Sequence, residues 1–455
     1  MIKLKSFPRF MICAPSSGSG KTLITCALLR ILVRKGYSPA SFKCGPDYID
    51  PMFHKKVLGI PGRNLDVFLM GHYGLRGALS RGTDGKDIGV LEGVMGFFDG
   101  MSTDSDEGSS ADICSITGTP AILVVNCKGM SRSVIPLIKG FCDYGKENFV
   151  RGVILNNVSL MVAKSLKKEI EKELEIPVIG FLPHLNNEPF SSRHLGLVMP
   201  EEIPQLLEII DEVADKLLEN LEFDKLMEIA ADTKKILMLR NFDIPGDLKD
   251  FKDREKIRVG VARDEAFCFY YEDNLDLLKQ LGAEIVPFSP IHDKNLPDVS
   301  RLILGGGYPE LYAKALSENK SMREDILRAA DSGMPILAEC GGFLYLQESL
   351  SDPEGINFEM VGALKGKGKM RDKLHHFGYV TMSSTLDNPY LKSGEEIKAH
   401  EFHYYDTTEN GEVCLLKKPS GKSWSGYQAK GKAFGGFAHL YYPSCPEFIK
   451  RFLEC

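Results

Sequence analysis

Long apolar runs are missing from this 455-residue sequence, in which no stretch approaches the ~20 apolar residues of a membrane span. The apolar run that follows the basic residues Lys3, Lys5 and Arg9 is also far shorter than the core of a signal peptide. The 56 basic and 62 acidic residues leave a formal net charge of −6, so nothing favours nucleic acid or an anionic membrane as a partner. We therefore expect a cytoplasmic protein that binds neither.

Paired cysteines are missing too. The 11 cysteines are scattered without a C-x-x-C pair, which favours single thiols, buried or reactive, over a zinc site or a disulfide framework. Internal repeats and low-complexity tracts are also absent. These absences exclude solenoids and disulfide-stapled scaffolds, and leave an ordinary globular chain long enough for two or three domains.

Strand-like and helix-like segments alternate along both halves of the chain. The runs "IGVLEGVMGFFDG", "PAILVVNC" and "RGVILNNV" predict buried strands, each followed by a polar or helical segment, which is a parallel α/β pattern. Around "NFDIPGDLKDFKDREK" apolar periodicity disappears, and "IRVGVARD" starts a new strand. We predict two α/β domains, residues 1–240 and 256–455, joined by a linker at 241–255.

A glycine-rich loop near the N-terminus carries the first chemical motif. A strand-like run precedes "APSSGSGKT", and apolar residues at helical spacing follow it, so strand, loop and helix occur in P-loop order. In such a loop Gly18 and Gly20 let the backbone approach a phosphate, Lys21 reaches the terminal phosphates, and the Thr22 hydroxyl ligates Mg²⁺. The alternative to a phosphate-binding loop is a plain turn before a surface helix. The flanking strand-like and helix-like segments favour nucleotide binding.

Acidic residues cluster at predicted strand ends in the same half. Asp47 and Asp50 follow a Gly-Pro turn, Glu92 ends an apolar strand, and Asp99 lies just beyond it. Strand carboxyl ends surround the ligand crevice of open parallel sheets, and carboxylates there suit Mg²⁺. We predict Asp47 and Glu92 as metal ligands, while Asp50 and Asp99 are equally well explained as turn or cap residues.

The second half contains a different motif. "PILAECGG" predicts a strand, a sharp turn and a helix start with Cys340 at the apex, the geometry of a nucleophile elbow. We expect an exposed thiol whose pKa the helix N–H groups lower, with His439 as its base and the backbone of Gly306 and Gly307 as oxyanion donors. The alternative is that Cys340 is a buried small hydrophobe.

The motifs together resemble the cobyrinate a,c-diamide synthase family, over essentially the whole chain. The matching segments, in order, are "SSGSGKT", "FKCGPDYIDP", "RNLD", "EGVMGFFDG", "RHLGLV", "GGGYPE", "AECGGFLYL" and "HEFHYY". The resemblance implies an N-terminal P-loop domain similar to dethiobiotin synthetase and a C-terminal domain similar to class I glutamine amidotransferases. It also implies that Asp47, Tyr48, Glu92 and Asp99 belong to the synthetase site.

The resemblance further implies a reaction. Members use ATP, Mg²⁺ and L-glutamine to convert the a and c acetate groups of cobyrinate to amides, through acyl phosphates. A sister amidase acting on another tetrapyrrole, such as nickel-sirohydrochlorin or hydrogenobyrinate, and a P-loop switch ATPase with an inactive amidotransferase domain stay open as alternatives. The oligomeric state is also open, with a homodimer as one arrangement.

Two positions bear on the transfer of site residues. Many class I amidotransferases have a glutamate two residues after the histidine, where this chain has Tyr441, so we assign a Cys340–His439 dyad. His400 and His403 are three residues apart in a strand-like segment and point to different faces, with no third ligand of clear spacing, so we assign them no metal. His375 and His376 receive no assignment.

Overall fold

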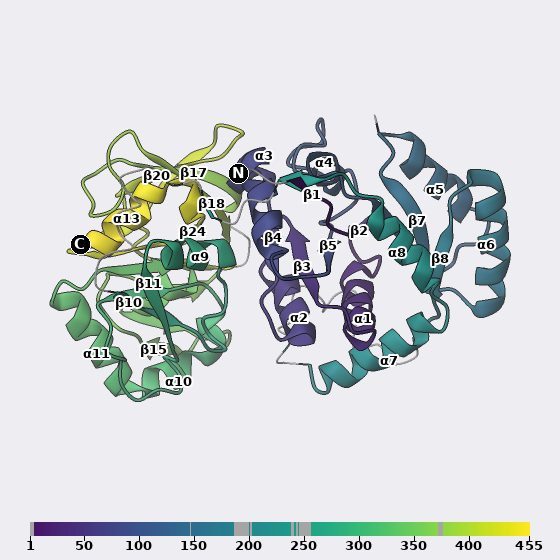
Figure 1. Ribbon diagram of the computed structural model, residues 1–455. Coiled ribbons are helices and arrows are strands. Elements are labelled where there is room, and N and C mark those ends of the chain that lie inside the picture. The colour runs from purple at the N-terminus through teal and green to yellow at the C-terminus, as the bar shows by residue number, and fades with distance from the viewer. Residues whose placement is uncertain are drawn as a thin grey trace. The chain divides into compact units, whose positions relative to one another are not determined.

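The chain folds into two compact units. The computed structural model describes residues 4–145, 147–185, 200, 203–237, 241–242, 244, 256–371 and 376–455 (Figure 1). The units are Met1–Asn241 and Phe242–Cys455. Most of the interval 241–255 lies outside the described residues, so the predicted linker stays a prediction. The segment "RHLGLV" at 193–198 and the unassigned His375 also lie outside the described residues.

The first unit alternates strands and helices from end to end. Its elements are β1 Leu4–Lys5, β2 Arg9–Cys13, α1 Lys21–Arg34, β3 Pro39–Cys44, α2 Ile49–Leu58, β4 Arg63–Leu65, α3 Val67–Gly82, β5 Ile88–Glu92, α4 Ser110–Thr117, β6 Ala121–Asn126, α5 Val134–Asp143, β7 Val150–Asn156, α6 Leu160–Leu174, β8 Val178–Leu182, α7 Leu206–Leu218, α8 Phe223–Ala231 and β9 Ile236–Leu237.

Seven parallel strands form the central sheet of this unit, in the order β4-β3-β5-β2-β6-β7-β8. Successive strand residues face opposite sides, so Met11 lies in a core with α3, α4, α5 and α6, whereas Ile12 lies in a core with α1, α2, α7 and α8. Both faces are covered, as a parallel sheet requires. The predicted α/β fold of this half is confirmed, including strands β5, β6 and β7.

A buried arginine joins the start of this unit to its end. Arg9 is fully buried and donates to Thr119 Oγ1 and to four backbone carbonyls, those of Phe7, Thr117, Gly118 and Lys234. Since its guanidinium is so well matched by acceptors, the cost of burying the charge is offset locally. Strand β1 also pairs antiparallel with β9, so the last segment of the unit lies against its first.

The second unit begins in the same way and then departs from the pattern. Its elements are β10 Ile257–Ala262, α9 Glu272–Gln280, β11 Ala283–Phe288, β12 Arg301–Leu304, η3 Pro309–Tyr312, α10 Ala313–Glu318, α11 Lys320–Asp331, β13 Ile336–Glu339, α12 Gly341–Leu346, β14 Ser349–Ser351, β15 Asn357–Glu359, β16 Lys367–Met370, β17 Phe377–Ser384, β18 Glu396–Phe402, β19 Tyr405–Thr407, β20 Cys414–Lys417, β21 Ser423–Gly426, β22 Gln428–Lys430, β23 Ala433–Gly436, β24 His439–Leu440, η4 Tyr442–Ser444 and α13 Pro446–Glu454.

The described residues of the second unit form three sheets. The largest, β11-β10-β12-β13-β23-β22, is parallel except for β22. One of its faces packs on α10, α11 and α12, and the other packs on α9, α13 and the antiparallel sheet β21-β20-β17-β18-β24. A small sheet, β15-β14-β16-β19, completes the unit. The region from β14 to β22 is β-rich, which the sequence analysis did not foresee.

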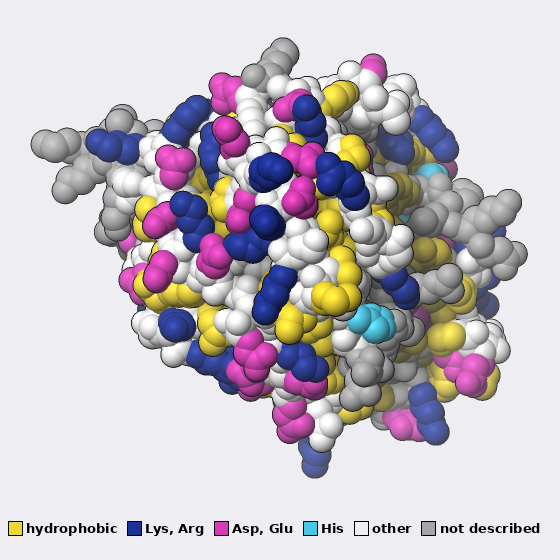
Figure 2. All heavy atoms as spheres, turned by 90° about the vertical axis from the view of Figure 1, so that its right-hand side faces the viewer, with side chains coloured by type: hydrophobic (Ala, Val, Ile, Leu, Met, Phe, Trp, Pro, Cys, Tyr) yellow, Lys and Arg dark blue, Asp and Glu magenta, His cyan; other side chains and the backbone are white. Residues whose placement is uncertain are grey.

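The surface of the first unit is mixed in charge where Figure 2 shows it. Basic and acidic side chains lie among one another on that face. Within α6 Lys167 pairs with Glu171, and Glu173 of α6 pairs with Arg132, which precedes α5. Exposed pairs of this kind contribute little to stability, and they produce no patch of one sign. Among the helices of the described residues, none is both long and apolar enough to cross a bilayer.

Candidate functional sites

The loop between β2 and α1 has the backbone that its glycines predict. Gly18 and Gly20 have φ of 75° and 97°, a region that side-chain-bearing residues rarely adopt. A Cβ at Gly20 would lie 2.4 Å from Nδ2 of Asn156, at the end of β7. That amide nitrogen donates to the Ser19 carbonyl at 2.9 Å, so a neighbouring strand holds the loop in place.

The Lys21 side chain connects this loop to the segment after β5. Its side chain is largely buried, and its Nζ donates to the Ser16 carbonyl at 3.2 Å and to the Met95 carbonyl at 2.5 Å. Burial lowers the pKa of Lys21, and the nearby charge of Lys43 lowers it further. An anion bound in the loop would offer this ammonium a stronger partner than the two carbonyls.

Thr22 lies in a buried cluster of charges. Its Oγ1 donates to Glu92 Oε1 at 2.6 Å and lies 3.2 Å from Asp50 Oδ1. Lys43 Nζ lies 2.5 Å from Asp50 Oδ2 and 3.1 Å from Glu92 Oε1, while His54 Nε2 lies 2.8 Å from Glu92 Oε2. Three oxygen donors therefore converge from α1, α2 and β5, a set that suits a hard divalent cation.

The charges of this cluster depend on one another. Burial raises the pKa of Glu92, but Lys43 and the hydrogen bond from His54 outweigh burial and hold that pKa well below its usual range. For Asp50 burial prevails, and the neighbouring Glu92 adds to it, so the Asp50 pKa is raised even beside Lys43. The site thus combines a firmly ionised Glu92 with a second carboxyl group that gains or loses charge with its surroundings.

The other predicted residues of this half lie around the cluster. Asp47 Oδ1 accepts from the Ile49 N–H at 2.8 Å, and its other oxygen lies 4.0 Å from Lys43 Nζ. Tyr48 is the residue before α2. Asp99 Oδ2 accepts from the Gly96 N–H at 2.8 Å, in a turn that packs against the glycine-rich loop through Phe97 N–H and the Ala14 carbonyl.

Sequence reasoning missed Lys43, His54 and Asn156 at this site. Lys43 and Glu92 are direct partners in the pairing of β3 with β5. A lysine just before a Gly-Pro turn and two acids was a usable signal, because a lysine is rarely buried without an anionic partner. His54 and Asn156 carried no such signal.

The second site is built around a strained turn between β13 and α12. Cys340 has φ 48° and ψ −106°, a conformation that costs an L-residue about 1–3 kcal/mol. Its N–H donates to the Gly436 carbonyl at 2.8 Å. A Cβ at Gly342 would lie 2.1 Å from the Leu304 carbonyl oxygen, so only glycine allows α12 to begin so close to β12. The predicted strand, turn and helix are all present.

The structure brings the predicted partners of Cys340 together. A Cβ at Gly306 would lie 2.2 Å from Cε1 of His439, so this loop runs directly against the imidazole. A Cβ at Gly341, the residue after the cysteine, would lie 3.2 Å from the Gly307 nitrogen. The loop that contains Gly306 and Gly307 therefore contacts both the elbow and the histidine, as a site with a nucleophile, a base and backbone donors requires.

The expected exposure and acidity of Cys340 are wrong. The residue is 7% exposed, and burial raises the pKa of its thiol, with the charge of Glu310 adding to the effect. The Gly341 N–H lowers this pKa as predicted, but burial is larger. Burial also lowers the pKa of His439 to about 3, with His400 and His403 contributing. Thiol and imidazole are thus both neutral in this structure, and a proton must pass between them when the thiol reacts.

A buried carboxyl group adjoins this histidine. Glu339 Oε2 lies 3.9 Å from His439 Nδ1, and Glu339 Oε1 accepts from the Tyr442 hydroxyl at 2.9 Å. Burial raises the pKa of Glu339 to about 8. Tyr441 instead donates to Asp273 Oδ2 at 2.9 Å. At 3.9 Å the Glu339 carboxyl group is too far from His439 Nδ1 for a hydrogen bond, although it is the carboxyl group beside the ring. The Cys340–His439 dyad therefore stays a prediction.

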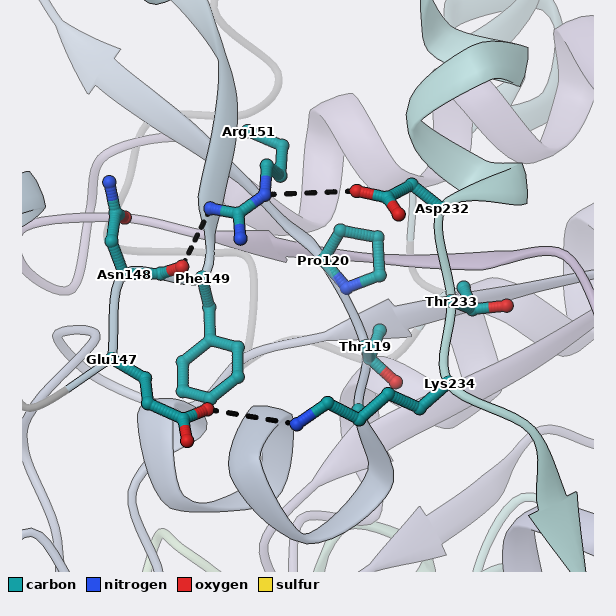
Figure 3. A pocket seen from close by; sticks show the side chains of 10 residues that line it. Thr119, Pro120, Glu147, Asn148, Phe149, Arg151, Asp232, Thr233 and Lys234 are labelled. Carbon is teal, nitrogen blue, oxygen red and sulfur yellow. Dashed lines mark hydrogen bonds and ion pairs between the residues drawn. The ribbon is translucent and has the colours of Figure 1, made fainter.

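A cavity of 540 Å³ lies elsewhere in the first unit (Figure 3). Thr119 and Pro120 precede β6 and Phe149 precedes β7, so the cavity is at the amino ends of strands, whereas the glycine-rich loop follows a carboxyl end. Its charged side chains face each other: Arg151 lies 3.9 Å from Asp232, and Lys234 lies 3.8 Å from Glu147. The position does not suit the ligand crevice of a parallel sheet.

Both halves of the chain match known protein families. Residues 10–193 match the CobQ/CobB/MinD/ParA nucleotide binding domain, and residues 258–444 match the CobB/CobQ-like glutamine amidotransferase domain. A cobyrinate a,c-diamide synthase of Listeria innocua is 39% identical over 97% of this chain and 98% of its own length. The chain belongs to the cobyrinate a,c-diamide synthase family.

Another member of this family, from Caldanaerobacter subterraneus, is 37% identical over 98% of this chain and 97% of its own length. The residues that match the nucleotide-binding family include the glycine-rich loop, and those that match the amidotransferase family include the Cys340 elbow. The predicted family and fold class are confirmed, and the chain is an amidotransferase of the ligase class.

Proposed function

We propose that the chain amidates the a and c acetate carboxylates of cobyrinate, using ATP and L-glutamine. The relatives that match over nearly the whole chain are named for this substrate. The observation that carries the proposal is the presence, in one chain, of a glycine-rich phosphate loop and a Cys340 elbow, with the Gly306–Gly307 loop in contact with both the elbow and His439. A cytoplasmic location and a homodimer remain predictions.

Glutamine hydrolysis is the first half of the proposed reaction. The Cys340 sulfur attacks the side-chain amide carbon of glutamine while its proton passes to His439. His439 returns that proton to the departing nitrogen, which leaves as ammonia, and the C–N bond is replaced by a thioester. Water then hydrolyses the thioester to glutamate with His439 as base, and the N–H groups of Gly306 and Gly307 receive the negative oxygen.

Activation of the carboxylate is the second half. The substrate carboxylate attacks the γ-phosphorus of ATP, ADP leaves, and ammonia then displaces phosphate from the acyl phosphate to form the amide. Lys21 holds the phosphate oxygens as charge builds on them. Activation is needed because a carboxylate is a poor electrophile at neutral pH.

The donor set around Thr22 fits Mg²⁺. Glu92 Oε1 and Asp50 Oδ1 lie 2.6 and 3.2 Å from the Thr22 hydroxyl oxygen, and all three atoms are oxygen ligands. Asp47 lies beside them with one oxygen engaged by the backbone, so it is placed to join through water. When bound, Mg²⁺ would offset the charge of the phosphate oxygens.

Mass spectrometry of the products tests the proposal. Purified protein is incubated with ATP, Mg²⁺, glutamine and a panel of tetrapyrrole carboxylates that includes cobyrinate, nickel-sirohydrochlorin and hydrogenobyrinate. Each amidation lowers the substrate mass by about one unit, since OH is replaced by NH₂. Two successive losses on cobyrinate support the proposal, two losses only on another tetrapyrrole support the sister amidase, and ATP hydrolysis without any amidation supports the switch ATPase.

A further inference from the structure

Three potential ligands meet at the end of the β17–β18 ladder. Phe377 pairs with Phe402 and Gly378 with Glu401, so the same register continued by one step sets His376 opposite His403. Glu401 Oε1 lies 2.9 Å from His403 Nε2 and 3.4 Å from His376 Nδ1. One atom from each residue lies within 4.8 Å of the others.

We propose that His376, Glu401 and His403 bind a divalent transition-metal ion of the zinc type in the amidotransferase unit. Bonds of ~2.0–2.2 Å in a tetrahedral site place ligand atoms roughly 3.4 Å apart, so the observed separations need only small side-chain movements. Two imidazoles and one carboxylate with an open position favour zinc or a similar ion over Mg²⁺, which prefers oxygen. His400 takes no part, because it packs against Phe377 and Tyr379.

Both imidazole rings are held in place, as metal ligands usually are. His403 Nδ1 contacts the Tyr405 carbonyl, and its ring stacks on Phe437 with centroids 3.9 Å apart and planes 7° apart. His376 stacks on Trp424 with centroids 4.1 Å apart and planes 17° apart. A carbonyl that accepts from one ring nitrogen directs the other nitrogen to the metal.

The contact between His403 and Glu401 requires a cation. A carbonyl oxygen only accepts, so His403 Nδ1 carries hydrogen and a neutral ring presents the Nε2 lone pair to Glu401 Oε1. Two acceptors 2.9 Å apart repel unless a proton or a metal ion lies between them.

The second oxygen of Glu401 points to the same conclusion. The side chain is 2% exposed, and within the described residues Oε2 is buried and has no hydrogen-bond partner. An unsatisfied buried carboxylate oxygen is destabilising, because it has lost its water and gained no partner. A metal ion bound by both oxygens of Glu401 would use that unmet capacity, whereas a single proton shared between Oε1 and His403 would leave it unmet.

Metal binding to the full chain tests the proposal. After chelation, the protein is titrated with Co²⁺, whose visible absorption reports its ligands, in the presence of excess Mg²⁺ to occupy oxygen sites. We expect one Co²⁺ per chain, displaced by Zn²⁺, with no thiolate-to-metal absorption. In His376→Ala and in Glu401→Gln, Co²⁺ should bind about a hundredfold more weakly or worse.

A matched control separates this site from surface histidines. His292 also lies 2.9 Å from a glutamate, Glu265, but this pair is exposed and has only two ligands. His292→Ala should bind Co²⁺ like the parent chain. The proposal is overturned if the parent binds no Co²⁺ at micromolar concentrations, which would make His403 a protonated partner of Glu401. It is overturned as well if Co²⁺ binding is unchanged in both ligand variants, whose folding is checked by circular dichroism.

Discussion

Gly306→Ala tests the arrangement of the glutaminase site directly. The added Cβ would lie 2.2 Å from Cε1 of His439, whereas carbon atoms pack at about 3.5–4.0 Å, so the ring must move by more than about 1 Å. The backbone of Gly306 is outside the left-handed region, so alanine adds no conformational strain. A misplacement of about 1 Å costs a catalytic group roughly 10²-fold, or about 2.7 kcal/mol.

Two assays and one control variant test this prediction. Glutaminase kcat/KM, measured as glutamate release, should fall about 10²-fold, while amidation supported by ammonium salts should stay normal. Gly426→Ala meets only the Cδ1 end of Leu416 and should keep both activities. In a His439→Ala background, Gly306→Ala should have almost no further effect, because the clashing ring is gone. Normal glutaminase activity in Gly306→Ala would refute the placement of His439 as the base.

Four other changes probe the remaining parts of the two sites. Lys21→Ala should lower amidation at least about 10²-fold with either nitrogen source and leave glutamate release measurable; near-normal amidation would contradict the phosphate-loop assignment. Cys340→Ala should make no product from glutamine yet amidate with ammonium at raised pH, and a folded variant that lost both reactions would place the thiol in the synthetase chemistry. Lys43→Met leaves two buried carboxyl groups without their cation, so the urea-derived free energy of unfolding should fall by about 3–5 kcal/mol; an unchanged value would show that the carboxyl groups do not need it. The Glu339 carboxyl group has a folded pKa of about 8 against an ordinary value of 4.5, so the free energy of unfolding should fall as pH rises between these values; Glu339→Gln should reduce that fall by a few kcal/mol, and equal pH slopes would refute it.

Local motifs were predictable because their function requires a particular backbone. Gly18 and Gly20 bend the phosphate loop through positive φ, and the small residues after Cys340 allow a helix to start against a neighbouring strand. Such constraints are carried by a few adjacent residues, so they can be recognised in the sequence.

The long-range parts of the sites were not predictable in this way. Lys43 meets Glu92 because β3 lies beside β5, and a single sequence does not state that pairing. His54 reaches the same carboxylate from α2 for an equally non-local reason. The acidity of Cys340 was predicted in the wrong direction because the elbow is covered by other segments, and burial outweighs a helix N–H group.

The antiparallel region was missed for a different reason. Strands such as β15, β19 and β22 are three residues long, too short to show an alternating pattern. His376 and His403 come together only through the ladder of β17 with β18. The sequence analysis weighed only the spacing of His400 and His403, and nothing in the sequence shows that His376 lies beside His403.

The buried Arg9 has a practical consequence for dissecting the enzyme. A fragment cut at residue 193, where the nucleotide-binding family match ends, would lack α7 and α8, which cover one face of the sheet. A fragment cut after α8 would still lack the Lys234 carbonyl that accepts from Arg9 and the β9 strand that pairs with β1. An isolated first half should therefore extend at least through Leu237, and because its two ends are paired neighbours, it is a natural candidate for circular permutation.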